Sequence, residues 1–314
     1  MKTVISVDVG GTKIAGALVN YAAEGEPPAI SERRSVPTDP ARGGAAVLGS
    51  IVALATELAE LGEAPLGVGV GTAGVVDPAS GSIRHAVSIM PGWLGQPVKA
   101  RLQEALGLPA AVLGDVQAHA LGEARWGAAR GAQSCLCVAP GTGLGGAFVM
   151  NGTVILGSHG AAGHIGHTLH PAAAGTTCGC GATAHVESVT SGTAIAAAYQ
   201  HRSLGDELDP ALMGGEVARR ANEGELEALA VIEAAGRALG EAIGSWCNIL
   251  DPELVVLSGS VTKAGPFWRR ALDAGFKSQV LTPLADTPLL FAALGGDAPL
   301  VGAAEHLMDT MSHQ

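Results

Sequence analysis

Asp8-Val9-Gly10-Gly11-Thr12-Lys13 lies between two short apolar segments, residues 4–9 and 14–19. Each segment has the length and composition of a buried strand, and the glycine pair predicts a tight turn that makes the whole stretch a β-hairpin. Glycines in such a turn let successive backbone N–H groups converge on an anion, and Thr12 and Lys13 add a hydroxyl and an ammonium donor. Asp8 can hold a metal ion or its waters. A plain hairpin turn without a ligand is the alternative, so this motif alone leaves phosphate binding open.

A second unit of the same kind occurs in the middle of the chain. Residues 134–139 are apolar, the turn Gly141-Thr142-Gly143-Leu144-Gly145-Gly146 follows, and residues 147–150 are apolar again. The turn matches G-x-G-x-x-G, but a dinucleotide-binding fold requires a helix directly after it. The Asn151-Gly152 pair instead predicts that residues 147–150 form a strand that ends in a hairpin turn. We therefore reject the dinucleotide-binding interpretation and expect a second phosphate-holding hairpin.

The composition is acidic and rich in small residues. The chain has 314 residues, 46 of them glycine, with 47% hydrophobic content and a formal net charge of −11. This hydrophobic content excludes a disordered chain, and the net charge argues against a nucleic-acid partner. The absence of an apolar run of eighteen residues predicts no membrane span, and the immediate strand pattern leaves no room for a signal peptide. With only five scattered cysteines, we expect a reduced, cytoplasmic protein.

The repeated hairpin predicts an internal duplication, with two lobes and a ligand cleft between them. We expect an α/β fold with a small N-terminal lobe over residues 1–115 and a large C-terminal lobe over residues 116–298. A helix over about residues 299–309 is expected to pack back on the first lobe.

In their order along the chain, these motifs resemble the ROK family of sugar kinases, which holds bacterial glucokinases and N-acetylhexosamine kinases. The resemblance covers the two glycine turns, Asp115 and the segments 71–77, 163–167, 178–187, 252–259 and 302–304. It implies a two-lobed fold like that of actin and hexokinase (ribonuclease H-like), with phosphate contacts from both turns. It also implies that Gly74 lies at the sugar and Gly259 at the nucleotide.

Asp115 follows the predicted strand over residues 110–113 and precedes a helical stretch. A carboxylate at the mouth of a cleft can take the proton of an attacking hydroxyl. Aspartate is equally favoured as a helix N-cap, so both roles are open from the residue alone. The resemblance implies that Asp115 is the general base.

Two positions depart from the ROK pattern. Gly114 stands where the family has an asparagine that contacts sugar hydroxyls, and His164 stands where it has a sugar-binding glutamate. Glu187 is retained, and its family counterpart binds the sugar end distant from the phosphate. Because a site that hydrogen-bonds a hydroxyl discriminates strongly, we expect the selectivity to differ from plain glucose specificity.

The segment from Cys178 to Glu187 carries two close thiols and an imidazole, which suit tetrahedral zinc. The resemblance implies a zinc loop with three cysteines and a histidine, and His185 replaces the third cysteine here. The predicted ligands are His167, Cys178, Cys180 and His185, with His170 as a substitute. An unmetallated loop or a redox pair are the alternatives. His167 is also expected at the sugar.

The resemblance implies a hexose kinase that uses ATP and Mg²⁺ to phosphorylate a sugar 6-hydroxyl, with structural Zn²⁺ bracing the sugar loop. An N-acetylhexosamine or other modified-hexose kinase is the alternative within this class. A non-catalytic sugar-sensing ROK protein is the alternative of another class, although no helix-turn-helix precedes the first strand and the net charge opposes DNA binding. The resemblance also implies a homodimer.

Overall fold

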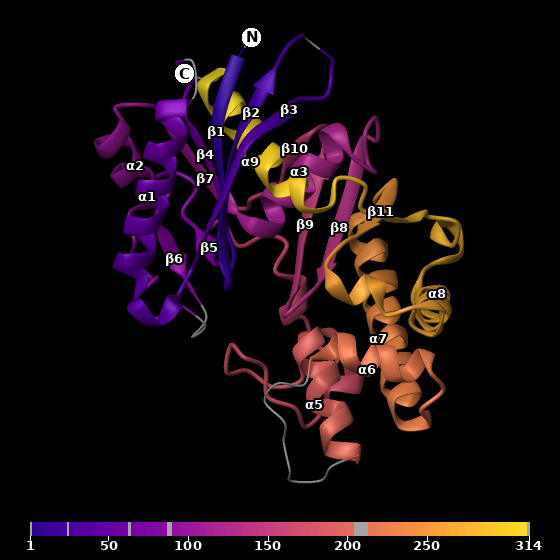
Figure 1. Cartoon of the computed structure of the whole chain (residues 1–314). Helices are drawn as coiled ribbons and strands as arrows, with labels where there is room; N and C mark the ends of the chain where they lie inside the picture. Colours follow the sequence, from indigo (N-terminus) through magenta and orange to yellow (C-terminus); the bar gives the residue numbers. More distant parts are fainter. Residues whose placement is uncertain (1, 24, 62–63, 87–89, 204–212, 313–314) are drawn as a thin grey trace. The chain divides into compact units, whose positions relative to one another are not determined.

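The computed structural model describes residues 2–23, 25–61, 64–86, 90–203 and 213–312, and the chain forms two compact units (Figure 1). The first unit consists of Met1–Ser134, Ala147–Gly163 and Ala292–Gln314. The second consists of Cys135–Gly146 and His164–Phe291. The first unit is thus assembled from three separate stretches of sequence.

The first unit is built on a five-stranded sheet with the order β3-β2-β1-β4-β7. Strand β2 (Lys13–Tyr21) is antiparallel to both β1 (Lys2–Val9) and β3 (Ala29–Pro37), so the predicted first hairpin is confirmed. Strands β4 (Val68–Thr72) and β7 (Ala110–Gly114) continue the sheet parallel to β1. The short strands β5 (Val75–Val76) and β6 (Ile83–His85) pair separately.

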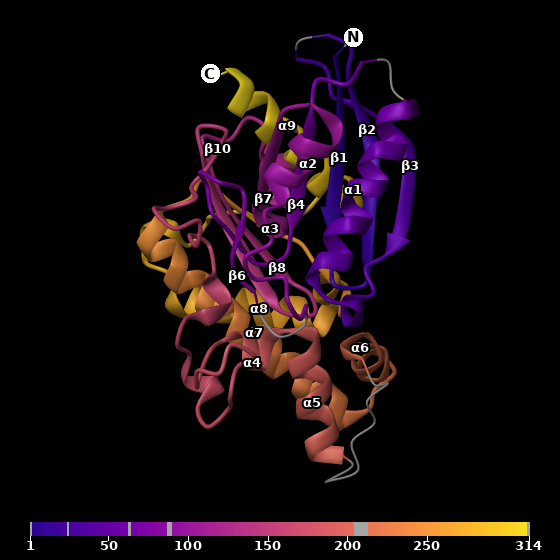
Figure 2. The same cartoon turned by 90° about the vertical axis from the view of Figure 1, so that its left-hand side faces the viewer.

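Helices cover both faces of this sheet, because its central strand β1 is apolar on both sides (Figures 1 and 2). Alternate residues Ile5, Val7 and Val9 lie in one core cluster with helices α1 (Gly44–Leu61) and α2 (Val98–Leu106). On the other face, Val4 packs in a second cluster with helix α9 (Ala298–Ser312). Helix α3 (Asp115–Trp126) packs closely against α9. The carboxyl end of β7 leads directly into α3, so Asp115 lies at the end of the sheet where the parallel strands β1, β4 and β7 finish.

Helix α1 is the one described helix that is long and apolar enough to cross a membrane, with a mean hydropathy of 1.5 over 18 residues. Its apolar side chains Val47, Ile51 and Leu58 are fully buried in the core of the first unit. Burial of this kind is what a core helix requires.

The second sheet has the order β10-β9-β8-β11-β12, which repeats the topology of the first. Strands β8 (Ser134–Pro140), β9 (Leu144–Met150) and β10 (Thr153–Val154) correspond in order to β1, β2 and β3. Strands β11 (Leu254–Leu257) and β12 (Leu289–Phe291) are parallel additions, as β4 and β7 are in the first sheet. The turn after β8 leads into a strand, so the rejection of a dinucleotide-binding turn is confirmed.

The helices of the second unit are α4 (Glu187–Thr190), α5 (Gly192–Ser203), α6 (Gly214–Asn222), α7 (Leu226–Leu250) and α8 (Pro266–Gln279). Helices α7 and α8 approach closely because Gly236, Gly240 and Gly244 form a row of small residues at intervals of four. A Cβ atom added at Gly236 would lie 2.5 Å from the Trp268 carbonyl oxygen, and one added at Gly244 would lie 2.8 Å from the Phe276 carbonyl oxygen. Part of the glycine excess therefore serves helix packing.

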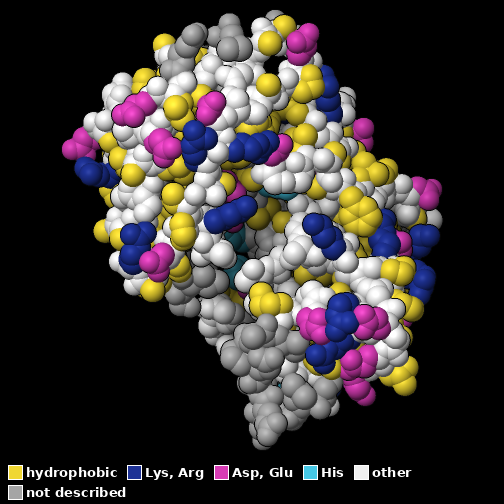
Figure 3. Space-filling model, viewed as in Figure 1, with side chains coloured by type: hydrophobic (Ala, Val, Ile, Leu, Met, Phe, Trp, Pro, Cys, Tyr) yellow, Lys and Arg dark blue, Asp and Glu magenta, His cyan; other side chains and the backbone are white. Residues whose placement is uncertain are grey.

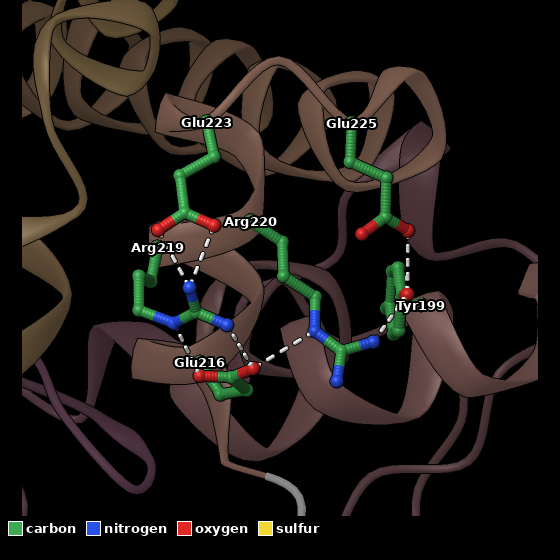
Figure 4. A network of polar contacts seen from close by, with 6 residues as sticks. All are labelled: Tyr199, Glu216, Arg219, Arg220, Glu223 and Glu225. Carbon is green, nitrogen blue, oxygen red and sulfur yellow. Dashed lines mark hydrogen bonds and ion pairs between the residues drawn. The ribbon is translucent and has the colours of Figure 1, made fainter.

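A polar network ties α5, α6 and the start of α7 together (Figure 4). The buried Tyr199 hydroxyl donates to Glu225 at 2.5 Å and accepts from Arg220 at 2.8 Å. Arg220 also pairs with Glu216 at 2.9 Å.

On the face of the molecule seen in Figure 3, cationic and anionic side chains are interspersed, as expected for a solvated surface.

Candidate active site and metal centre

In the first unit, two carboxylates lie at the carboxyl ends of β1 and β7, the parallel strands on either side of β4. Asp8 on β1 is in register with Gly71 on β4, and Gly71 is in register with Leu113 on β7. Asp115 follows two residues later, at the start of α3. A Cβ atom at Gly71 would lie 3.8 Å from both Asp8 Oδ1 and the Asp115 Cα atom. An added Cβ would also lie 3.1 Å from the Ala118 Cβ atom, so Gly71 lets the first turn of α3 approach β4 closely, at the end of the sheet where open sheets typically bind ligands.

The ionisation of Asp8 is strongly perturbed. Burial, followed by the nearby Asp115 carboxylate, raises the pKa of Asp8 to about 7, while the Lys13 ammonium acts in the opposite direction. Two carboxylates that repel each other in this way are characteristic of functional sites, because a bound cation relieves the repulsion. The donor set of Asp8 and Asp115 therefore fits a divalent metal ion.

Asp115 is the first residue of α3, and Gly114 occupies the N-cap position. The Asp115 carboxylate accepts a hydrogen bond from the Val116 N–H at 2.8 Å. The Gln117 side chain, at the third helical position, accepts a hydrogen bond from the Gly114 backbone N–H, with a distance of 3.1 Å to Oε1. The helix start is thus capped without Asp115 in the N-cap position, which weakens the purely structural interpretation of this residue.

The first glycine turn is closed by the Gly10 N–H, which donates to the Lys13 carbonyl at 3.0 Å. Thr38 braces the turn from outside: its buried hydroxyl donates to the Gly10 carbonyl at 2.7 Å, and its N–H donates to the Thr12 carbonyl at 3.0 Å. The predicted residues Gly11 and Thr12 are exposed in the turn, as is Lys13 at the start of β2. Nothing in the local sequence indicates Thr38, because the contact spans 28 residues.

The second glycine turn is held by the amino end of α5. The Gly192 N–H donates to the Gly141 carbonyl at 2.7 Å, and the Thr193 hydroxyl donates to the Thr142 carbonyl at 2.8 Å. Gly259 packs against the Pro140–Gly141 peptide, since its added Cβ would lie 2.7 Å from the Pro140 carbonyl carbon. The predicted nucleotide residue Gly259 and this turn are therefore neighbours within the second unit.

Glu187 packs against the same turn. Its Oε2 accepts from the Leu144 N–H at 2.8 Å and would lie 2.7 Å from a Cβ atom at Gly143. Gly141 and Gly143 do not have φ in the left-handed region. Glycine is required at position 143 because the carboxylate occupies the space of a side chain.

The four predicted zinc ligands come together in the second unit. The donor atoms of His167, Cys178, Cys180 and His185 all lie within 4.8 Å of one another. Cys178 Sγ is 3.6 Å from His167 Nδ1, and Cys180 Sγ is 3.3 Å from His185 Nδ1. Tetrahedral Zn–S and Zn–N bonds imply an S···N separation of about 3.5 Å, so both pairs fit a zinc ion.

The backbone of the zinc loop is shaped by a tight turn between the two thiols. The Gly181 N–H donates to the Cys178 carbonyl, and the Cys178 N–H donates to the Ala182 carbonyl, both at 2.8 Å. Gly181 has φ +91°, a conformation that a side chain would strain. His170 is not in the cluster: its Nδ1 accepts from the Ala172 N–H at 3.2 Å, so it does not replace a ligand here.

The loop also contacts Glu187. The Cys178 thiol donates to Glu187 Oε1 at 3.4 Å. Burial raises the pKa of Cys178 to about 11, and the nearby Glu187 carboxylate raises it further by a smaller amount. The thiol is therefore protonated unless a cation replaces the proton. The same carboxylate therefore links the cysteine cluster to the second glycine turn.

The predicted sugar residues are divided between the two units. Gly74 and Gly114 belong to the first unit, and His164, His167 and Glu187 belong to the second. The exposed His164 ring stacks on His167, with 6.3 Å between ring centroids and an interplanar angle of 19°. The His164 ring therefore neighbours the ring of His167, a predicted zinc ligand.

The ROK family model matches residues 4–309. The chain belongs to the ROK family. The predicted family and α/β fold are thus confirmed, and the match covers nearly the whole chain.

Two of the similar proteins are named as sugar kinases. A glucokinase of Halalkalibacterium halodurans is 35% identical over 95% of this chain and 92% of its own. An N-acetylmannosamine kinase of Escherichia fergusonii is 31% identical over 96% of this chain and 97% of its own. Both names agree with the phosphotransferase activity expected from the sequence.

Solved ROK structures have the same fold. The ROK hexokinase of Thermus thermophilus aligns with a TM-score of 0.85 and 29% identity, over 99% of this chain and all of that one. A ROK glucokinase of Streptomyces griseus, solved with glucose and AMPPNP, aligns with a TM-score of 0.77 and 28% identity over 96% and 98% of the two chains.

Proposed function

We propose that this protein is a cytoplasmic hexose kinase that transfers the γ-phosphate of ATP to a sugar 6-hydroxyl. The observation that carries the proposal is the position of Asp115 at the carboxyl end of β7, beside Asp8 and next to a glycine turn. The glucose and ATP analogue bound by the Streptomyces griseus relative support the substrate class.

In this proposal Asp115 accepts the proton of the 6-hydroxyl as the sugar oxygen attacks the γ-phosphorus. The bond from phosphorus to the β,γ-bridging oxygen breaks, and ADP leaves with that electron pair. Phosphoryl transfer depends mainly on positioning and charge neutralisation, so the backbone N–H groups of the two turns and Lys13 would hold the phosphates. Gly259 would border the nucleotide.

Two metal ions belong to the proposal. Asp8 would hold Mg²⁺, directly or through water, and that ion would neutralise phosphate charge and leave Asp115 as the base. Zn²⁺ bound by His167, Cys178, Cys180 and His185 would fix the loop before Glu187 and orient that carboxylate. Glu187, His164 and His167 are the proposed sugar contacts of the second unit, and Gly74 and Gly114 are those of the first.

A coupled assay over glucose, mannose, allose and their amino and N-acetylated forms tests the activity. Asp115→Asn is expected to lower kcat by about 10²- to 10⁴-fold while zinc content and thermal stability stay unchanged. Full activity of Asp115→Asn would refute the assigned base. A folded, zinc-loaded protein without turnover on any sugar would refute the kinase assignment.

An N-acetylhexosamine is the second candidate substrate, favoured by the relative named N-acetylmannosamine kinase. The ratio of kcat/KM for N-acetylmannosamine and glucose decides between the two. A homodimer, expected from the family resemblance, is part of the proposal, and sedimentation equilibrium measures it directly.

A further inference from the structure

Gln117 lies in the first turn of α3 and is only 5% exposed. Its Oε1 accepts from the Gly114 N–H at 3.1 Å. Its Nε2 donates to the carbonyl of Gly160 at 3.2 Å and to that of Ala162 at 3.3 Å. A buried amide with both N–H donors engaged is a strong local constraint, because each lost partner leaves a polar atom without water.

The two carbonyls belong to the loop over residues 157–163, which is otherwise closed on itself. The Ala162 N–H donates to the Leu156 carbonyl at 3.1 Å. Gly160 has φ +75°, and a side chain there would overlap the Val76 carbonyl of β5. The loop is thus pressed between β5 and the Gln117 amide, both in the first unit.

Gly114 and Gln117 depend on each other sterically. A Cβ atom at Gly114 would lie 3.0 Å from Gln117 Oε1 and 3.3 Å from its Cδ, both tighter than ordinary contact. The glutamine side chain would therefore have to shift by a few tenths of an ångström to admit a side chain at position 114. Displacing it would release the Gly160 and Ala162 carbonyls at the same time.

We infer that Gln117 is a positioning residue, which fixes the loop over residues 157–163 relative to Asp115 and thereby determines sugar affinity and selectivity. The inference rests on the proposed kinase function. The Gln117 amide connects Gly114, the residue before the base, with the loop that leads into His164. A shift of this side chain therefore changes the sugar contacts. The two glycine turns do not depend on Gln117, because Thr38 and the amino end of α5 hold them.

The chemistry of the contact separates glutamine from its nearest substitutes. Gln117→Glu keeps the acceptor for Gly114 but directs a carboxylate at two carbonyl oxygens. Gln117→Met keeps the length and removes both donors. Gln103→Glu, on the exposed face of α2, is the matched control for the change of charge.

Steady-state kinetics with sugar and ATP varied separately tests the inference. For Gln117→Glu and Gln117→Met we expect the KM for the sugar to rise about tenfold, as the loss of two hydrogen bonds implies. The KM for ATP should change less than about twofold. The ratio of kcat/KM for glucose and N-acetylmannosamine should also shift, and Gln103→Glu should match the parent protein.

Equal increases in both KM values, or a lowered kcat with an unchanged sugar KM, would overturn the role of Gln117. If both variants fail to fold, Gly114→Ala perturbs the same contact from the other side, and an unchanged sugar KM would then be the contrary result. Calorimetric titration of glucose keeps the two proposals distinguishable. A parent protein that binds but does not phosphorylate sugars refutes the kinase function, while weaker binding by the Gln117 variants would still support positioning.

Discussion

Replacement of Gly302 by alanine tests whether the contact between α9 and α3 controls the position of the proposed base. An added Cβ at Gly302 would lie 2.7 Å from the Ala118 carbonyl carbon, 2.8 Å from the Gly122 nitrogen, and would overlap the Ala118 carbonyl oxygen. Ordinary contact begins at 3.4 Å, and backbone atoms of α3 surround the new methyl group. The two helices must therefore separate.

The expected magnitude follows from two opposing effects. Alanine in a helix interior is favoured over glycine by about 1 kcal/mol. Forcing an extra methyl group into a packed interface costs about 1–3 kcal/mol, and the cost lies at the upper end when the opposing atoms are backbone. We expect a net loss of about 2 kcal/mol in the free energy of unfolding. Because α3 begins at Asp115, a shift of this helix should also lower kcat by about tenfold or more.

The same substitution at Gly49 is the matched control. Gly49 is exposed in α1, and an added Cβ there has no neighbour within 4 Å. Gly49→Ala should raise stability by up to about 1 kcal/mol and leave kcat unchanged. Thermal unfolding and the sugar kinase assay on both variants give the comparison. Equal stabilisation of both variants, with kcat retained in Gly302→Ala, would refute the packing argument.

Two further predictions concern the charged and metal-binding groups. Because the pKa of Asp8 is raised from 3.8 to about 7, the folded state holds more protons than the unfolded state in this window, and stability falls as pH rises through it. Asp8→Asn should therefore stabilise the ligand-free protein at pH 8 by at most about 4 kcal/mol, with a smaller gain toward pH 4, while abolishing activity. For the metal centre, His185→Cys should retain about one zinc per chain and His185→Ala should lose it, as measured by elemental analysis.

Controls separate these outcomes from general effects. Asp286 is exposed, so Asp286→Asn should leave the pH dependence of the melting temperature unchanged. An Asp8→Asn variant that is less stable than the parent at pH 8 would contradict the assigned burial effect. For zinc, a chelator should lower the melting temperature of the parent and of His185→Cys, and equal zinc content in all three proteins would show that His185 is not a ligand.

Much of the fold was predictable because its signals are local. Helix α2, for example, ends at Leu106, and the sequence marks this end with Gly107 and Pro109 directly after it. Both hairpins were recognisable from glycine turns between apolar runs. Strand β3 was missed, because its central residues Glu32, Arg33 and Arg34 are charged and lie on a sheet edge, where polar residues are common.

The site was predictable only in part, for a related reason. Turns, thiols and the carboxylate after β7 are recognised by their immediate neighbours in sequence. Thr38, Thr193 and Gln117 were missed, because their partners are backbone carbonyls 28, 51 and 43 residues away. A threonine or glutamine has no sequence signature for such a contact. The sequence predicts Gly143 only as part of a phosphate-holding turn, whereas in the structure its missing side chain makes room for the Glu187 carboxylate.

The discontinuous first unit has a consequence for biosynthesis. Its sheet is complete once β7 has been made, but α9, which covers one face of β1, is synthesised about 185 residues later. On the ribosome the apolar face formed by Val4, Val19 and Ala111 stays without α9 while the whole second unit emerges and folds. Folding of the unit that carries Asp115 must therefore finish after translation of the second unit, and a nascent chain stalled before Ala298 should require chaperone protection of that face.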